Sequence, residues 1–114
     1  MTKISTHVLD TALGSPAAGV PVILEHSDPS GVWQTVASSK TDTDGRCKLP
    51  ESESYLLKEG LYRLSFDTKS YFAAKNILGL YPSVQITFEV RPSESHFHIP
   101  LLLSPNGYTT YRGS

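Results

Sequence analysis

Seven short runs of the chain alternate between apolar and polar residues, and turn-forming residues separate them. Such alternation is typical of β-strands that turn one face to a core and the other outward. The runs cover residues 4–9, 20–26, 33–39, 46–49, 61–67, 83–90 and 96–103. The turn Ser104-Pro105-Asn106-Gly107 then leads into a closing hairpin, which adds an eighth run. We therefore predict an all-β fold, a two-sheet β-sandwich of seven to eight strands.

One segment, residues 70–78, has the composition of a short helix. Ser70 is expected to cap its N-terminus, and Gly79 is expected to end it. Residues 10–19 are predicted to be a connecting loop. In the polar segment 50–60, the apolar side chains are expected to pack against the fold; they are Tyr55, Leu56 and Leu57. With 114 residues, we expect a single domain that covers residues 1–114.

The charge pattern excludes several function classes. The formal net charge is -1 and there is no basic run, so neither nucleic acid nor an anionic membrane surface is an expected partner. No apolar stretch approaches the roughly 20 residues that span a bilayer, and the first ten residues lack the apolar core of a signal peptide. A single cysteine, Cys47, cannot form an internal disulfide and fits a reducing compartment.

Two of the four histidines lie on the last long strand, on the face that points away from the core. Phe97, Ile99, Leu101 and Leu103 form its predicted core face, whereas His96 and His98 lie on the opposite face. His7 likewise lies opposite the core face of the first strand. A neutral imidazole is a natural general base near neutral pH, although solvated surface histidines would show the same pattern.

The spacing His96-x-His98 also fits two zinc ligands on one strand face, with His7 as a possible third. No nearby cysteine or carboxylate completes a recognisable metal motif, and we predict no metal site. A separate feature is the acidic turn of residues 42–45, which places Arg46 at the start of a short strand. There Arg46 is either a solvated charge or a fixed fork for carboxylate, ureide or oxyanion groups.

Three stretches together resemble a known family. The C-terminal HFHIPLLLSPNGYTTYRGS is similar to the signature of the transthyretin-related proteins, and specifically to the hydroxyisourate hydrolase branch that ends in Tyr-Arg-Gly-Ser. The stretch STHVLDTALGSPAAGVPV, residues 5–22, resembles the opening pattern of that family, and TDTDGRC, residues 41–47, resembles its arginine-bearing turn. The hormone-carrying transthyretins share Leu-Leu-Ser-Pro but lack the histidines, the arginine and the terminal tetrapeptide.

The resemblance implies a transthyretin-like sandwich that assembles as a homotetramer, a dimer of dimers, with active sites in the channel between dimers. The implied reaction is the cofactor-free hydrolysis of 5-hydroxyisourate to 2-oxo-4-hydroxy-4-carboxy-5-ureidoimidazoline, a step of urate degradation in purine metabolism. Four residues on the predicted outer face give an independent reason to expect a partner subunit, since they are apolar or aromatic: Leu9, Pro100, Leu102 and Tyr111.

The resemblance also implies the site residues. The implied catalytic residues are His7, His98, Arg46 and Ser114, and the implied substrate-binding residues are Arg46, Tyr111, Arg112 and Gly113. The residues alone leave open which histidine is the general base, and whether the hydroxyl or the terminal carboxylate of Ser114 acts. Alternation places Arg112 on the opposite face from Tyr111. A C-terminal tag is expected to impair such a site.

Two other readings are consistent with parts of the pattern. A transthyretin-like carrier of a hydrophobic ligand, without catalysis, predicts an apolar channel. A generic monomeric sandwich domain predicts that the histidines are ordinary surface residues. Relatives of the family occupy different compartments, and we expect peroxisome or cytoplasm, although the terminal Arg-Gly-Ser is not the usual Ser-Lys-Leu peroxisomal signal and no other targeting signal is visible.

Overall fold

The computed structural model describes residues 3–50 and 57–114, which form nine strands and one short helix. The elements are β1 (Lys3–Asp10), β2 (Ser15–Pro16), β3 (Pro21–Ser27), β4 (Trp33–Lys40), β5 (Arg46–Leu49), β6 (Gly60–Phe66), α1 (Thr68–Ala73), β7 (Val84–Val90), β8 (His96–Ser104) and β9 (Gly107–Thr110). The predicted two-sheet, all-β fold with one helix is confirmed. The predicted strand number was too low because the two-residue β2 lies within the segment expected to be a loop.

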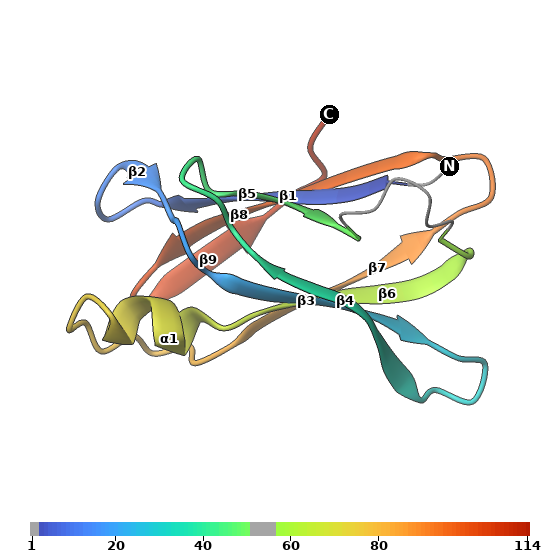
Figure 1. Ribbon diagram of the computed structural model, residues 1–114, viewed down its shortest axis with the longest axis horizontal. Coiled ribbons are helices and arrows are strands. Elements are labelled where there is room, and N and C mark those ends of the chain that lie inside the picture. Colours follow the sequence, from blue (N-terminus) through green and yellow to red (C-terminus); the bar gives the residue numbers. More distant parts are fainter. Residues whose placement is uncertain (1–2, 51–56) are drawn as a thin grey trace.

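The strands form two sheets that lie as two layers (Figure 1). In one sheet, the order is β4-β3-β6-β7 and every pairing is antiparallel. In the other sheet, β1 pairs along one edge with β8 in parallel, and β9 follows β8. The other edge of β1 pairs first with β5 and then with β2. The two ends of the chain therefore lie side by side at the centre of this sheet.

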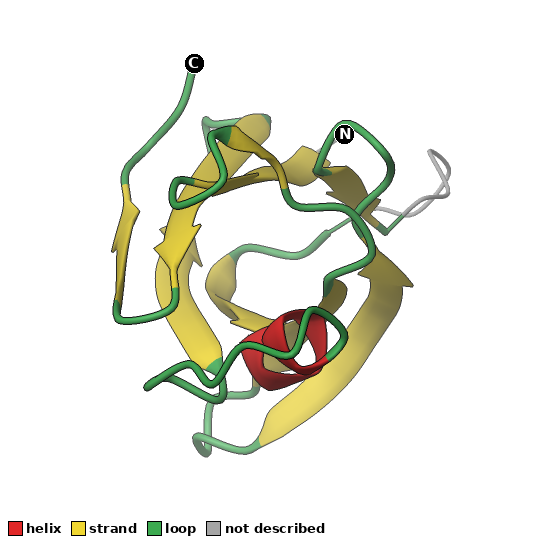
Figure 2. Ribbon diagram, turned by 90° about the vertical axis from the view of Figure 1, so that its left-hand side faces the viewer, coloured by secondary structure: helices red, strands yellow, loops and turns green. Residues whose placement is uncertain are grey.

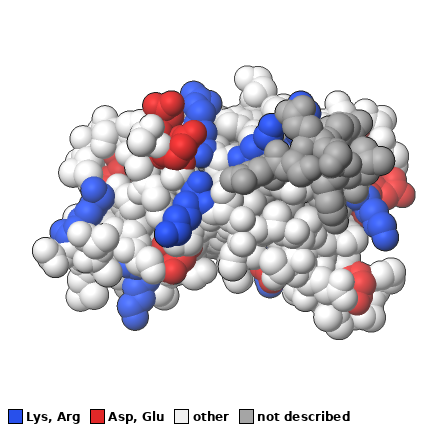
Figure 3. Space-filling view, in the orientation of Figure 1, with Lys and Arg blue, Asp and Glu red and all other residues white. Residues whose placement is uncertain are grey.

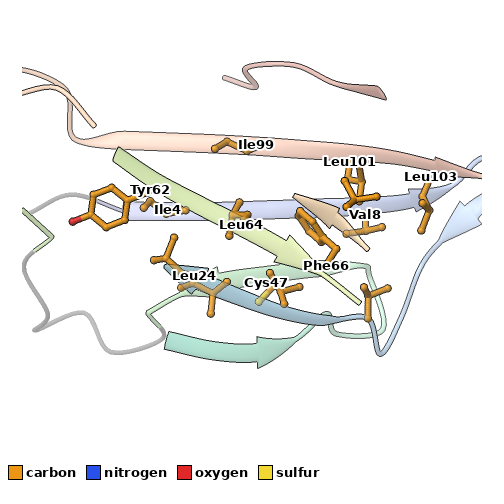
Figure 4. Close-up of a cluster of buried hydrophobic side chains, with 14 of the residues drawn as sticks. Ile4, Val8, Leu24, Cys47, Tyr62, Leu64, Phe66, Ile99, Leu101 and Leu103 are labelled. Carbon is orange, nitrogen blue, oxygen red and sulfur yellow. The ribbon is translucent and has the colours of Figure 1, made fainter. Parts of the chain in front are cut away.

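The core fills the space between the two sheets. Its side chains come from alternate positions, so that Phe97, Ile99, Leu101 and Leu103 of β8 are buried as predicted. Figure 4 shows the side chains of β1 and β8 facing those of β3 and β6, among them Leu24, Leu64 and Phe66. In the end-on view of Figure 2, α1 lies in front of the sheets at one end of the sandwich.

The predicted helix boundaries were wrong at both ends. The N-cap is Asp67, whose carboxylate accepts hydrogen bonds from the backbone N–H and the hydroxyl of Ser70. Asp is as good an N-cap as Ser, so the cap moves three residues upstream. At the C-terminus, the helix stops at Ala73, and Asn76 adopts a left-handed conformation with φ 58°. Asn tolerates this conformation better than most residues, and it turns the chain well before Gly79.

Leu57 is buried against the core as predicted, whereas Tyr55 and Leu56 lie outside the described residues. Among the residues that the structure describes, no helix is long and apolar enough to cross a membrane. On the face drawn in Figure 3, acidic and basic side chains are interspersed among neutral ones.

Candidate active site

The parallel pairing of β1 with β8 brings together residues that are about ninety positions apart in the sequence. Ser5 lies opposite His98, and His7 lies opposite Pro100. On the other edge of β1, His7 lies opposite Arg46 of β5. Because register partners in a sheet project to the same side, these residues all occupy the outer face of the sheet. His7 and His98 therefore lie in one sheet and face the same side of it.

A pocket of about 530 Å³ opens on this part of the sheet. Its lining comes from four strands, the acidic turn and the C-terminal residue: Ser5, Thr6, Ser39, Lys40, Asp42, Arg46, Cys47, Lys48, His96, His98 and Ser114. The structure thus brings together three of the predicted catalytic residues, His98, Arg46 and Ser114. His7 is adjacent to Arg46 in the sheet but does not line this pocket.

His98 is held from several directions. The Ser5 hydroxyl lies 2.8 Å from Nδ1 of the imidazole, and the backbone N–H of Gly113 donates to the His98 carbonyl oxygen at 2.7 Å. Partial burial lowers the pKa of His98, and the nearby His96, His7 and Arg46 lower it further by charge repulsion. The ring is therefore neutral near pH 7 and can accept a proton.

His7 has a defined tautomer. Its Nε2 lies 2.8 Å from the carbonyl oxygen of Asp44. A carbonyl oxygen can only accept a hydrogen bond, so we assign the proton of the neutral ring to Nε2. The basic nitrogen of His7 is consequently Nδ1.

The acidic turn that precedes β5 fixes the position of Arg46. Asp42 Oδ1 accepts hydrogen bonds from the backbone N–H groups of Asp44 and Arg46, both at 2.9 Å. Gly45 has φ 77°, and a side chain there would collide with the carbonyl oxygen of Val8. Glycine is thus required twice, for its conformation and for the close approach to β1. The turn delivers Arg46 beside His7 with its side chain exposed.

Arg112 and Tyr111 lie apart from these residues. Arg112 Nη1 is 2.6 Å from Glu94 Oε1, and the guanidinium lies over the Phe97 ring at 4.8 Å. The hydrogen bond from Arg112 is the main reason that the pKa of Glu94 is lowered. Both Arg112 and Tyr111 line a second pocket of about 320 Å³, which is shared with β7 and β8. Arg112 thus lies against Phe97, a core-face residue of β8, and not on the face of the histidines.

The outer face of the β1–β8 sheet is less apolar than the sequence predicted. Pro100 is already buried within the subunit, so the apolar outer surface is smaller than predicted, whereas Leu9 and Leu102 are half-buried and Tyr111 is exposed.

Within residues 3–50 and 57–114, no group of three or more His, Cys, Asp or Glu side chains is arranged to hold a metal ion.

Sequence reasoning missed Ser5 and Lys48, which line the pocket with His98. Both lie in one row across the sheet, because Lys48 is the register partner of Ser5 and Ser5 is the register partner of His98. The alternation of β1 already placed Ser5 on the His7 face. What the sequence did not reveal was which strands pair with β1.

Comparison with known proteins gives a consistent result. Residues 4–113 match the model of the HIUase/Transthyretin family. The 5-hydroxyisourate hydrolase of Mus musculus is 43% identical over 114 residues, which cover 99% of this chain and 96% of the mouse protein. The structure of Klebsiella pneumoniae 5-hydroxyisourate hydrolase superposes with a TM-score of 0.86 at 36% identity and covers 100% of both chains. Sea bream transthyretin in complex with thyroxine gives a TM-score of 0.89 at 28% identity, over 96% of this chain and 93% of that one.

Proposed function

This chain belongs to the HIUase/transthyretin family, and we propose that it is an enzyme that hydrolyses 5-hydroxyisourate in the degradation of urate. The product is 2-oxo-4-hydroxy-4-carboxy-5-ureidoimidazoline. One observation carries the proposal: a single pocket contains the neutral base His98, the cation Arg46 and the hydroxyl of Ser114. The reaction needs a base for water and a positive group for the oxyanion.

The proposed chemistry uses only side chains of the protein. His98 takes a proton from water, and the water oxygen bonds to a carbonyl carbon of the six-membered ring. Arg46 donates hydrogen bonds to the oxyanion that develops on that carbonyl and to the ureide edge of the substrate. The ring C–N bond then breaks, the leaving nitrogen takes the proton that His98 received from water, and the new acid group loses its own proton to solvent and is released as a carboxylate.

The remaining residues have supporting roles in this proposal. His7, the register partner of Arg46, provides a second proton relay through Nδ1, because its Nε2 is hydrogen-bonded to the carbonyl oxygen of Asp44. The Ser114 hydroxyl hydrogen-bonds to the substrate at the pocket wall. Gly113 allows the chain to approach the His98 ring closely. Tyr111 and Arg112 line the second pocket and not the His98 pocket. The hydrogen bond of Arg112 to Glu94 favours a positioning role for Arg112 over substrate binding.

We also propose that the protein is a homotetramer, a dimer of dimers. The support is the outer face of the β1–β8 sheet, where Leu9 and Leu102 are only half-buried, together with the exposed side chain of Tyr111. A partner subunit over this face would shield the site from bulk solvent while the reacting water remains inside. The proposed compartment is the peroxisome or the cytoplasm, which fits a chain whose one cysteine, Cys47, is buried.

The alternative is a transthyretin-like carrier of a hydrophobic ligand without catalysis. The resemblance in fold to sea bream transthyretin is compatible with it. The pocket disfavours it, because Arg46, Lys48, His96 and His98 would be desolvated by an apolar ligand without receiving hydrogen bonds in return.

The test is direct. 5-Hydroxyisourate is generated from urate with urate oxidase, and its ultraviolet decay is followed with and without the protein, in the presence and absence of a chelator. We expect the wild-type protein to accelerate the decay, the chelator to have no effect, and the variants His98→Ala and Arg46→Ala to lose the acceleration. A wild-type rate equal to the spontaneous decay would refute the proposal.

A further inference from the structure

The Ser5 hydroxyl is the side-chain group hydrogen-bonded to the imidazole of His98 in the described structure. Ser5 Oγ lies 2.8 Å from His98 Nδ1, and the two residues are register partners in the parallel β1–β8 pair. Both side chains are half-buried, and both line the same pocket. The contact therefore rests on the central pairing of the sheet and not on a mobile loop.

We propose that Ser5 is a positioning residue that holds His98 in the tautomer with the proton on Nδ1, so that Nε2 is the proton acceptor in the pocket. This inference rests on the proposed function and adds the atom at which the base acts. Ser5 itself does not react. It accepts a hydrogen bond from Nδ1–H and so fixes both the rotation and the protonation state of the ring.

The chemistry of proton transfer selects this direction for the hydrogen bond. A serine hydroxyl can donate or accept. If Ser5 donated to Nδ1, the neutral ring would carry its proton on Nε2 and could not take one from water there. If Ser5 accepts, the same bond serves the neutral ring and the imidazolium, and it strengthens when the ring becomes charged. Only the second arrangement supports a base at Nε2 without breaking a hydrogen bond during the reaction.

His7 provides an internal contrast. Its Nε2 faces the carbonyl oxygen of Asp44, which cannot donate, so the backbone fixes its tautomer. Within residues 3–50 and 57–114, no carbonyl oxygen is hydrogen-bonded to the His98 ring, and the Ser5 hydroxyl takes that place. The two histidines of the face are thus held with opposite nitrogens protonated, Nε2 in His7 and Nδ1 in His98.

Other charged groups near His98 affect how readily its ring is protonated. The ionisable groups that line the pocket or lie beside the ring are His96, His7, Arg46, Lys48, Lys40, Asp42, Cys47 and the terminal carboxylate of Ser114. Most of them are cationic or become so on protonation, and His96, His7 and Arg46 oppose an imidazolium at His98. A hydrogen-bond acceptor at Nδ1 stabilises the imidazolium and partly offsets this charge repulsion.

Three variants test the role of Ser5. In Ser5→Ala, we expect kcat/KM on the pH plateau to fall by about 10- to 100-fold, because the ring loses its orientation. The acidic limb of the pH profile should also move to lower pH, because the imidazolium loses an acceptor. Ser5→Thr keeps the hydroxyl and should restore both quantities. Ser65→Ala is the matched control, since it removes another half-buried strand hydroxyl, one bonded to Glu25 on the other sheet, and should change neither.

The tautomer can be measured without any variant. Two-bond ¹⁵N–¹³C–¹H correlation spectra of the wild-type protein at mildly alkaline pH should show His98 protonated at Nδ1. Protonation at Nε2 would overturn the inference, and so would a Ser5→Ala enzyme with the rate and pH profile of the wild type. A wild-type protein that fails to hydrolyse 5-hydroxyisourate would instead overturn the proposed function, and the spectrum would still decide the tautomer.

Discussion

A methyl group on Gly113 would lie 2.5 Å from Cδ2 of the His98 imidazole. Real side chains do not approach so closely, so in Gly113→Ala either the ring or the C-terminal segment must move. Gly113 is also held by its N–H, which donates to the His98 carbonyl oxygen at 2.7 Å. We expect the ring to be displaced and kcat/KM to fall by about 10- to 100-fold, since misplacement by about 1 Å has costs of this size. Steady-state kinetics with 5-hydroxyisourate measure it.

Gly107→Ala is the control for this change. A Cβ on Gly107 would meet only Ser104 Oγ, at 3.7 Å, which is an ordinary contact. Its activity should match the wild type. Full activity in Gly113→Ala would show that the close approach to His98 has no role in catalysis.

The acidic limb of the pH–rate profile should lie below the ordinary range of histidine. The pKa of His98 is lowered mainly by burial, and the base must be neutral to act. Activity should therefore persist as the pH falls through about 6.5, the unperturbed value, and be lost only as the pH passes the lower pKa of His98. The profile of kcat/KM in the free enzyme reports this midpoint. A midpoint above the unperturbed value would contradict His98 as the base.

The lowered pKa of His98 also makes the free energy of unfolding depend on pH. Between the lower pKa of the folded state and the unfolded pKa of histidine, the unfolded chain binds a proton at position 98 that the folded chain does not bind. The contribution of His98 is thus fully present above about pH 6.5 and is lost as the pH falls from there toward the lower folded pKa. Urea unfolding of the wild type and of His98→Gln at several pH values should show the difference shrinking on acidification.

Tyr71→Phe should weaken the attachment of α1 to the β1–β8 sheet. The Tyr71 hydroxyl donates to Asp10 Oδ2 at 2.7 Å, and both residues are buried. The other oxygen of Asp10 accepts from the N–H groups of Ala12 and Leu13. Without Tyr71, a buried carboxylate oxygen loses its donor, which costs about 1–3 kcal/mol. The ring itself remains, so the contact of Lys75 with its face should persist.

Chemical denaturation measures this loss as a lower urea midpoint with an unchanged m-value. The matched control is Tyr108→Phe, since Tyr108 is 43% exposed and its hydroxyl can bond to water instead. A Tyr71→Phe protein as stable as this control would mean that the buried hydrogen bond contributes nothing to the fold.

Much of the fold followed from alternation, because burial in a two-sheet sandwich depends on which residues share a face. The core face of β8 was predicted residue by residue for this reason. The helix boundaries were not, since Asp67 and Ser70 are equally good caps by type and only the structure distinguishes them. The two-residue β2 has too little sequence to show any period.

The residues of the candidate site were likewise predicted only in part from the sequence. His7, His98 and Arg46 were found because unusual residue types occupy outward positions, and the resemblance to a family supported them. Ser5 is a common strand residue, and its importance depends on the pairing of β1 with β8 across 93 positions of sequence. Local pattern does not encode such pairing. Nor could it reveal that Glu94 binds the guanidinium of Arg112.

Arg112 is expected to act through Glu94 and not through the substrate. Its guanidinium donates to Glu94 Oε1 at 2.6 Å and to the His96 carbonyl oxygen at 3.2 Å, and it is absent from the lining of the His98 pocket. Arg112→Ala and Glu94→Ala should therefore lower kcat/KM by similar amounts, less than about fivefold, because exposed ion pairs contribute little. The double variant should be no worse than either single variant, since both remove the same interaction.

Arg46→Ala is the comparison that makes this result decisive. Removal of a group that stabilises an oxyanion costs about 10²- to 10³-fold in kcat, far more than the loss expected at Arg112. Initial rates over a range of 5-hydroxyisourate concentrations separate the cases for all four variants. A tenfold rise in KM in Arg112→Ala, with Glu94→Ala unchanged, would show that Arg112 leaves Glu94 to bind the substrate.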